Sequence, residues 1–242
     1  MLEYTVNVTS AYKNPLVTVD IAIFTVRDDA LAVLLVQRPP SSDDPHPGEW
    51  ALPGGLVDIE RDTDLLACAR RKLKEKTGVV TTYLEQVGAW GNRKRDPRGW
   101  SVTQVYFALM PSMDVELRAG ANAADVRWAP IEDGATGVGE RLAFDHSNLL
   151  AFALERLRGK VEYTSLPAFL LPEEFTLSEL QRAYEIVLGR PLEKSAFRTR
   201  VSDAGLVEKV PRKRRTTNRP AQLYRLKERA PVYFPRTFSP RS

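Results

Sequence analysis

Residues 93–100, with the sequence RKRDPRGW, place four cationic side chains and one large aromatic ring close together. An arginine fork can bind a phosphate through two hydrogen bonds, and a tryptophan ring can stack on a base or a ribose. This segment therefore indicates a site for a phosphorylated ligand that also contains a flat ring.

A second cationic cluster lies near the C-terminal end of the sequence. It occupies one tight turn region and consists of Arg212, Lys213, Arg214, Arg215 and Arg219. Like charges in one hairpin repel each other, so such crowding destabilises the chain unless a polyanion binds there.

A helix expected over Leu192–Ala204 precedes this hairpin. Phe197, Val201 and Ala204 can face a core, while Ser202 lies on the opposite, polar side. Arginine and serine read base edges, and lysine and arginine bind phosphates. This division into an apolar and a polar side fits a helix that lies in the major groove of DNA. An ordinary helix with one solvated face would show the same division. The basic hairpin that follows favours the DNA-binding interpretation. The expected DNA contacts are Lys194, Ser195, Arg198, Thr199, Arg200, Arg212, Lys213, Arg214, Arg215 and Arg219.

The charge of the chain is divided unevenly. The 242 residues carry a net charge of +4. Residues 160–242 contain 17 Lys and Arg against 9 Asp and Glu, a net of +8, so residues 1–159 carry −4. This asymmetry suggests an acidic body joined to a part that binds a polyanion, or a solvated basic tail.

Composition excludes several other classes of protein. With 43% hydrophobic and 27% charged residues, the chain is expected to be globular. One cysteine and two histidines are too few for a dedicated zinc site. The N-terminus lacks a basic segment followed by an apolar one, and the longest apolar run, Leu31–Val36, is far shorter than the ~20 residues that span a bilayer. We expect a soluble, cytoplasmic protein that does not bind membranes.

The first part of the chain alternates strands with helices. A hairpin is expected around Asp28-Asp29, which joins two β-branched and aliphatic segments. Strands are predicted over Val17–Thr25, Leu31–Val36, Thr81–Trp90, Ser101–Met110 and Val126–Trp128, and helices over Thr63–Lys76 and Asp145–Leu157.

A second unit follows. Thr176 and Glu179 form the capping-box pattern before a helix with apolar helical spacing, and Gly189 can end that helix. The next helix and two short strands, Leu206–Val210 and Leu223–Leu226, complete the order of a winged helix-turn-helix. The predicted domains are therefore residues 1–158 and 159–242.

Residues 50–58 (WALPGGLVD) and 70–79 (RRKLKEKTGV) resemble the signature of Nudix hydrolases, G-x5-E-x7-R-E-U-x-E-E-x-G-U, in which U is a bulky aliphatic residue. The resemblance implies an α+β fold over roughly the first 150 residues, with a mixed sheet between helices. It also implies a ligand that is a nucleoside diphosphate linked to another group.

The signature departs from the family at its metal ligands. When Gly78 is aligned, the family arginine falls at Arg71 and the three helix glutamates fall at Lys72, Glu75 and Lys76. A divalent ion ~4 Å from an ammonium group is repelled by roughly 8 kcal/mol at an effective dielectric of ~20. We therefore expect no metal, no cofactor and no catalytic residue. The two lysines could meet the diphosphate or form salt bridges.

Residues 95–99 (RDPRG) resemble a stretch found in Nudix proteins of NAD and ADP-ribose metabolism, in which Arg38 would lie at the edge of the pocket. Trp50 could stack on adenine or belong to the core, and His146 is expected to cap or pack rather than catalyse. The expected ligand-binding residues are Arg38, Trp50, Gly54, Gly55, Lys72, Glu75, Lys76, Arg95, Arg98 and Trp100.

Residues 218–224 (NRPAQLY) resemble the wing of the Nudix-related transcriptional regulators called the NrtR group, in which glycine stands in place of Asn218. The resemblance implies a repressor of NAD-metabolism genes that binds operator DNA as a symmetric homodimer and senses ADP-ribose or a related nucleotide. Arg219 would reach into the minor groove.

Two other functions fit the sequence. One is an active ADP-ribose pyrophosphatase whose basic domain serves localisation. The other is a regulator of sugar utilisation with a different phosphorylated effector.

Overall fold

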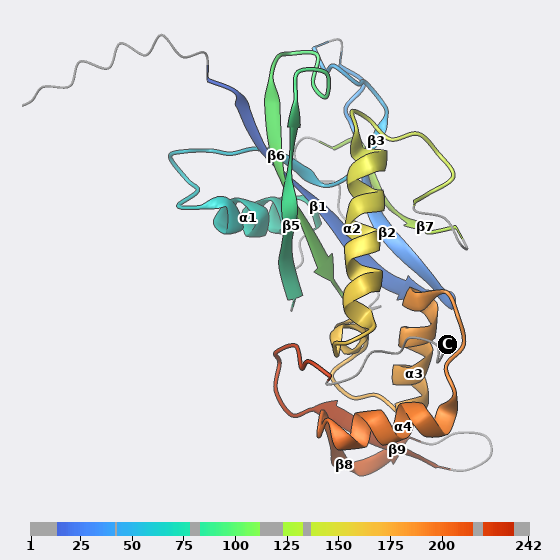
Figure 1. Ribbon diagram of the computed structural model, residues 1–242. Helices are drawn as coiled ribbons and strands as arrows, with labels where there is room; N and C mark the ends of the chain where they lie inside the picture. Colours follow the sequence, from blue (N-terminus) through green and yellow to red (C-terminus); the bar gives the residue numbers. More distant parts are fainter. Residues whose placement is uncertain are drawn as a thin grey trace, which may run out of the picture.

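A mixed β-sheet forms the centre of the first unit (Figure 1). The computed structural model describes residues 14–41, 43–77 (backbone only at 76 and 77), 83–111, 123–132, 137–214 and 220–234. Within these ranges the sheet contains seven strands: β1 (Leu16–Arg27), β2 (Ala30–Gln37), β3 (Trp50–Ala51), β4 (Gly54–Leu56), β5 (Tyr83–Asn92), β6 (Ser101–Leu109) and β7 (Asp125–Pro130).

The strand order is β3-β2-β1-β6-β5, with β4 beside β1 and β7 beside β2. β1 and β6 are parallel, and the other pairs are antiparallel. The expected mixed sheet is thus confirmed. The β1–β2 hairpin turns at Asp28 and Asp29, whose φ angles are +48° and +59°. Two consecutive positive φ angles match the right-handed twist of a hairpin, and aspartate tolerates them better than most residues.

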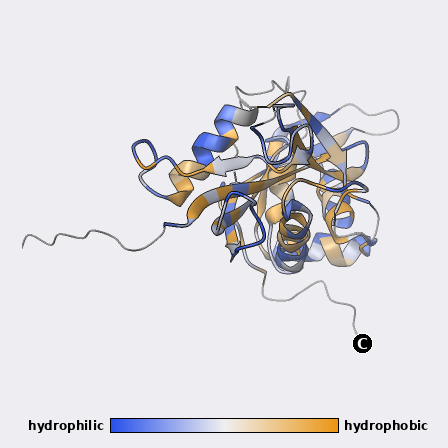
Figure 2. Ribbon diagram, turned by 90° about the horizontal axis from the view of Figure 1, so that it is seen from above, coloured by the Kyte–Doolittle hydropathy of each residue, from blue (hydrophilic) through white to orange (hydrophobic). Residues whose placement is uncertain are grey.

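Two helices, α1 (Leu65–Thr77) and α2 (His146–Val161), cover opposite faces of this sheet. Successive side chains of a strand point to opposite faces. Accordingly, Ala22 and Phe24 of β1 join the cluster that contains α2, whereas Ile21 and Ile23 join the cluster that contains α1. Figure 2 shows the hydrophobic segments gathered in the middle of the molecule.

The second unit is a winged helix. It contains a short 3-10 helix, η1 (Leu166–Leu170), the helices α3 (Leu177–Leu188) and α4 (Lys194–Asp203), and the hairpin β8 (Val207–Arg214) and β9 (Ala221–Leu226). The predicted capping box of Thr176 and Glu179 is present, and Gly189 ends α3 with a φ of +66°. β8 extends beyond Val210 because Lys213 and Arg214 pair with β9.

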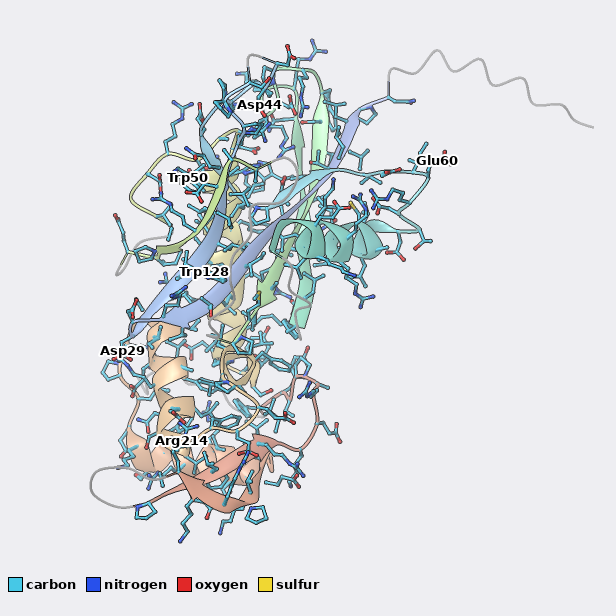
Figure 3. The ribbon with its side chains drawn as sticks, turned by 180° about the vertical axis from the view of Figure 1, so that it is seen from behind. Asp29, Asp44, Trp50, Glu60, Trp128 and Arg214 are labelled. Carbon is cyan, nitrogen blue, oxygen red and sulfur yellow. The ribbon has the colours of Figure 1, made fainter. Side chains whose placement is uncertain are left out.

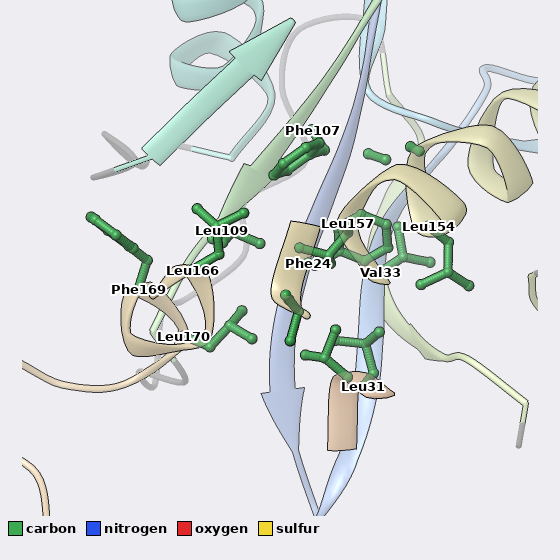
Figure 4. Close-up of a cluster of buried hydrophobic side chains, with 14 of the residues drawn as sticks. Phe24, Leu31, Val33, Phe107, Leu109, Leu154, Leu157, Leu166, Phe169 and Leu170 are labelled. Atoms are coloured by element: carbon green, nitrogen blue, oxygen red, sulfur yellow. The ribbon is translucent and has the colours of Figure 1, made fainter. Parts of the chain in front are cut away.

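One hydrophobic core joins the two units. Phe24 and Leu31 of the sheet, Leu157 of α2, and Tyr184 and Phe197 of the winged helix belong to the same buried cluster. Figure 4 shows a close-up of this cluster and labels members from the sheet, α2 and η1: Phe24, Leu31, Val33, Phe107, Leu109, Leu154, Leu157, Leu166, Phe169 and Leu170.

The predicted domain division after residue 158 falls inside α2, which continues to Val161. The division itself stays a prediction. Across the ranges given above, the structure contains no helix that is both long and apolar enough to span a bilayer.

The shared core predicts one cooperative unfolding transition. Leu157→Ala removes a fully buried side chain and should lower the free energy of unfolding by about 2–5 kcal/mol. All four tryptophans lie at residues 50–128, so their fluorescence reports the first unit, while far-UV circular dichroism also reports α3 and α4. Both signals should shift together in a denaturant titration.

The exposed neighbour Glu155 supplies the control, since Glu155→Ala should stay within about 0.5 kcal/mol of the unchanged protein. Two separate transitions in the Leu157→Ala protein would contradict a common core.

Candidate functional site

A cavity of about 700 Å³ opens beside β1, β2, β4 and the start of α2. This volume lies in the range of cofactor-sized ligand sites. Seven predicted ligand-binding residues line the cavity: Arg38, Gly54, Gly55, Lys72, Glu75, Arg95 and Arg98. The lining also contains polar and aromatic residues outside the predicted ligand set, among them Asp20, Asp44, Asp96, Phe144 and His146.

Arg95 forms the buried floor of the cavity. Its Nε and Nη2 atoms each donate to Asp145 at 3.1 Å, and Nη2 also donates to Asp20 at 3.4 Å. The side chain is only 4% exposed. Arg95 is therefore paired with two carboxylates, of which Asp20 also lines the cavity, and its role in ligand binding stays a prediction.

His146 stands at the first position of α2 and faces the same floor. The backbone N–H of Leu52 donates to His146 Nδ1 at 3.0 Å, so the ring proton of the neutral form is assigned to Nε2, which lies 3.6 Å from Asp20 Oδ1. Burial lowers the pKa of His146, so the neutral form dominates at neutral pH. His146 packs, as expected, and also lines the cavity.

Two arginines at the rim are each held by a carboxylate. Arg38 binds Asp44 through Nε and Nη2 at 2.7 and 2.8 Å, with its guanidinium carbon 4.7 Å from the centre of the Phe144 ring. Arg98 binds Asp96 in the same two-point manner, at 3.0 and 2.8 Å. These pairs fix the orientation of both guanidinium planes before any ligand binds.

Lys72 reaches across from α1 to β4. A Cβ atom at Gly55 would lie only 3.1 Å from Lys72 Nζ, and Gly55 has a φ of +145°. A Cβ at Gly54 would lie 2.2 Å from Asp20 Oδ1. The two glycines therefore let the ammonium group and the floor carboxylate approach the strand closely.

The residues around Glu75 do not fit a magnesium ion. Arg61 donates to one carboxylate oxygen of Glu75 at 3.0 Å, and Arg71 donates to the other at 3.1 Å. Mg²⁺ needs oxygen ligands, yet cations already occupy both oxygens, and Lys72 lines the same cavity. Within the part of the chain that the structure describes, no three acidic, histidine or cysteine side chains are placed to share a metal ion.

Nearby acidic residues have other partners. Asp62, whose side chain is only 1% exposed, binds Arg71 at 2.6 Å. These hydrogen bonds hold the pKa of Asp62 well below its usual value. Asp64 accepts the backbone N–H of Ala67 at 2.7 Å and so supports the start of α1. This helix begins at Leu65, slightly later than predicted.

Two predicted stacking residues lie outside the cavity lining. In β3 the alternation of side chains turns Ala51 toward the cavity. The Trp50 ring instead packs against the core and lies 4.2 Å from the Arg127 guanidinium carbon. Trp100 is 47% exposed, whereas its neighbour Ser101 is buried against Arg95. The backbone of Lys76 continues α1, and its side chain is outside the described structure.

The predicted DNA-facing helix has the expected two sides. Phe197 and Val201 are buried, and four predicted contact residues are exposed: Lys194, Ser195, Arg198 and Thr199. Glu193 caps the helix by accepting the backbone N–H groups of Ser195 and Ala196, which lowers the pKa of Glu193 to about 2.

Arg200 is more buried than the other expected DNA contacts of α4. Its side chain is partly buried, and its guanidinium carbon lies 5.8 Å from the centre of the Phe234 ring. The segment after β9 brings Phe234 back to α3, where it also packs against Tyr184. Arg200 therefore holds this segment against the winged helix.

The hairpin β8–β9 carries exposed cations. Arg212, Lys213 and Arg214 all lie on β8 and are exposed, while Arg215 and Arg219 fall outside the described residues. Figure 3, which views the molecule from behind, places Arg214 at the winged-helix end and Glu60 near the opposite end.

The sheet between two helices and the winged helix match two known families. The model of the NUDIX domain matches residues 16–151, and that of the NrtR DNA-binding winged helix domain matches residues 167–226. The protein thus combines a Nudix fold with a winged helix of a DNA-binding class.

Relatives extend this match over most of the chain. The ADPR responsive transcriptional repressor NtrR of Acinetobacter baylyi is 50% identical over 216 residues, which cover 89% of this chain and 84% of that protein. The chain belongs to the NrtR family.

Solved structures agree. The crystal structure of Shewanella oneidensis NrtR complexed with a 27mer DNA has a TM-score of 0.82 and 44% identity, covering 91% of this chain and 98% of that one. The NUDIX domain of the same protein complexed with ADP ribose has a TM-score of 0.54 and 46% identity, covering 62% of this chain and 92% of that one.

The buried histidine predicts a pH dependence of stability. The ordinary histidine pKa is 6.5, and the pKa of folded His146 is lower, so the unfolded chain binds more protons as the pH falls. The free energy of unfolding should therefore decrease below about pH 6.5, by at most about 1.4 kcal/mol per pH unit from this group.

Denaturant titrations at about pH 7.5 and about pH 5.5 measure this decrease. His146→Asn keeps an acceptor for the Leu52 N–H and should show a smaller decrease, while His46→Gln, which changes the only other histidine, should retain it. An equal decrease in the His146→Asn and unchanged proteins would contradict the role of His146.

Proposed function

We propose that this protein is a DNA-binding transcriptional repressor whose Nudix cavity binds ADP-ribose or a related nucleotide and thereby controls DNA binding. The observation that carries the proposal is a cation-lined cavity without a fitting metal site, joined by one hydrophobic core to an exposed cationic helix. The names of the relatives support the same pairing of ADP-ribose with DNA.

The cavity offers the diphosphate of such a ligand fixed cations in place of a metal. Lys72 contributes an ammonium group beside Gly55, and Arg38 and Arg98 contribute oriented guanidinium groups at the rim. Asp20 and His146 at the floor add groups that can hydrogen-bond sugar hydroxyls. Because Glu75 is bound by two arginines, the domain binds its ligand without hydrolysing it.

The winged helix supplies the DNA-binding surface. Helix α4 enters the major groove, where Ser195 and Arg198 read base edges, and the β8–β9 hairpin contacts the phosphate backbone. As a homodimer in the cytoplasm, the protein binds a near-palindromic operator of NAD-metabolism genes with half-sites separated by one or more helical turns.

Helix α2 connects the two sites. Its N-terminal end carries His146, which lines the cavity, and follows Asp145, which binds Arg95 of the cavity floor. Toward its C-terminal end, Arg158 donates to the backbone oxygen of Val187 in α3 at 3.1 Å. A ligand weakens DNA binding only if it binds the released form more tightly than the DNA-bound form. Because α2 packs the cavity floor and the winged helix into one unit, a change at the floor can reach the DNA-binding surface.

The direct experiment is a fluorescence-anisotropy titration of a labelled duplex from the upstream region of the gene, with and without ADP-ribose. Tight, salt-dependent binding that ADP-ribose weakens supports the whole proposal. Binding that ADP-ribose leaves unchanged retains the DNA-binding function and points to another effector, such as a sugar phosphate. Magnesium-dependent release of AMP from ADP-ribose would instead show a pyrophosphatase.

Removing one phosphate-binding cation should weaken the ligand complex selectively. Lys72→Gln should reduce ADP-ribose binding by about 1.5–3 kcal/mol in isothermal titration calorimetry, because a hydrogen bond to a charged group is lost. Lys74→Gln changes an exposed lysine of the same helix that is absent from the cavity lining, and it should have little effect. Equal losses in both variants would contradict a direct contact from Lys72.

The exposed face of α4 can be tested in the same way. Arg198→Ala should reduce operator affinity by about 1–3 kcal/mol if the guanidinium contacts a base. Arg182→Ala removes the same charge from α3, where the side chain binds Asp29 at 3.2 Å, and should change operator affinity little. ADP-ribose affinity should be unchanged in both variants; a loss in Arg198→Ala would contradict the separation of the two sites.

A further inference from the structure

The wing arginines of β8 are paired with glutamates around the start of α3. Arg212 binds Glu174, with Nε at 2.7 Å and Nη2 at 2.6 Å from the same carboxylate oxygen. Arg214 binds the Glu179 carboxylate through Nη1 and the backbone oxygen of Glu174 through Nη2 at 3.2 Å. Two of the expected phosphate-binding cations therefore already have anionic partners within the protein.

Hydrogen bonds fix the backbone beside Glu174 and the carboxylate of Glu179. Phe175, next to Glu174, exchanges two backbone hydrogen bonds with Tyr224 of β9, at 2.9 and 2.8 Å. Glu179 also accepts the backbone N–H of Thr176 at 2.7 Å as part of the capping box. The fold thus positions the Glu179 carboxylate directly, and it positions the backbone from which the Glu174 side chain extends to Arg212.

Strand alternation separates the paired cations from their neighbour. Arg212 and Arg214 lie two positions apart on β8, so they point to the same side, and Lys213 points to the other. The Arg212 side chain remains 72% exposed despite its partner. Solvent, and hence a DNA phosphate, can reach the guanidinium group that Glu174 binds.

We propose that Glu174 and Glu179 set the strength of DNA binding by competing with DNA phosphates for Arg212 and Arg214. The inference rests on the proposed DNA-binding function, and it identifies the two glutamates as the residues that limit the affinity of the protein for DNA. A phosphate must displace a carboxylate that stays nearby, so each paired arginine adds less affinity than a free one. Phosphate contacts carry no sequence information, so operator and random duplexes are weakened alike.

Glu174→Gln tests this competition because it removes the carboxylate charge and leaves the Glu179 capping box intact. The variant should bind a random duplex about two- to fivefold more tightly, the range of an exposed ion pair. It should bind the operator more tightly by the same factor. The slope of log K against log salt should become steeper by at most about 0.9, the value for one full additional phosphate contact.

Glu60→Gln supplies a charge-matched control at the far end of the molecule (Figure 3) and should leave both quantities unchanged. In addition, Arg212→Ala should cost more affinity in the Glu174→Gln protein than in the unchanged protein, because only in the variant does Arg212 bind phosphate without displacing a carboxylate. Equal affinity and slope in the Glu174→Gln and unchanged proteins, with equal thermal midpoints, would overturn the inference. An absence of salt-dependent duplex binding by the unchanged protein would instead overturn the proposed DNA-binding function.

Discussion

The structure depends on the continuous buried face of α2. From His146 and Leu149 at its start to Leu157 and Val161 at its end, this face is closed from solvent. The same helix therefore contributes to the cavity floor, the core beneath the sheet and the support of α3. Because protein interiors are packed as densely as organic crystals, neither end of α2 can shift independently of the residues between them.

Electrostatic pairing shapes both candidate sites. In the cavity, Arg38, Arg95 and Arg98 are each bound by aspartates, and on the wing Arg212 is bound by a glutamate. Such pairs orient guanidinium groups and reduce the repulsion among clustered cations. Counting basic residues therefore overestimates the positive charge that is available to a ligand. Lys72, which lines the cavity beside Gly55, is for this reason central to the proposed binding of a diphosphate.

Local signals in the sequence predict much of this structure. The turn at Asp28-Asp29, the capping box of Thr176 and the two faces of α4 each depend on residues a few positions apart, so the sequence alone identifies them. The partners of the arginines are different: Asp20 lies 75 positions from Arg95, and no periodicity links them. The position of the Trp50 ring, against the core and away from the cavity lining, likewise follows from the register of a two-residue strand, which no local pattern specifies.

The shared core also limits how a ligand can act on DNA binding. A flexible linker would let the two units move freely, yet here Tyr184 and Phe197 of the winged helix belong to the same cluster as Phe24 of the sheet. Asp29 at the tip of the β1–β2 hairpin further binds Arg182 of α3. Packed interfaces switch between discrete arrangements rather than deforming gradually. We therefore expect a ligand that alters the Arg95–Asp145 contact to move α2 together with the winged helix, and in the proposed symmetric dimer such a movement would change the separation of the two α4 helices.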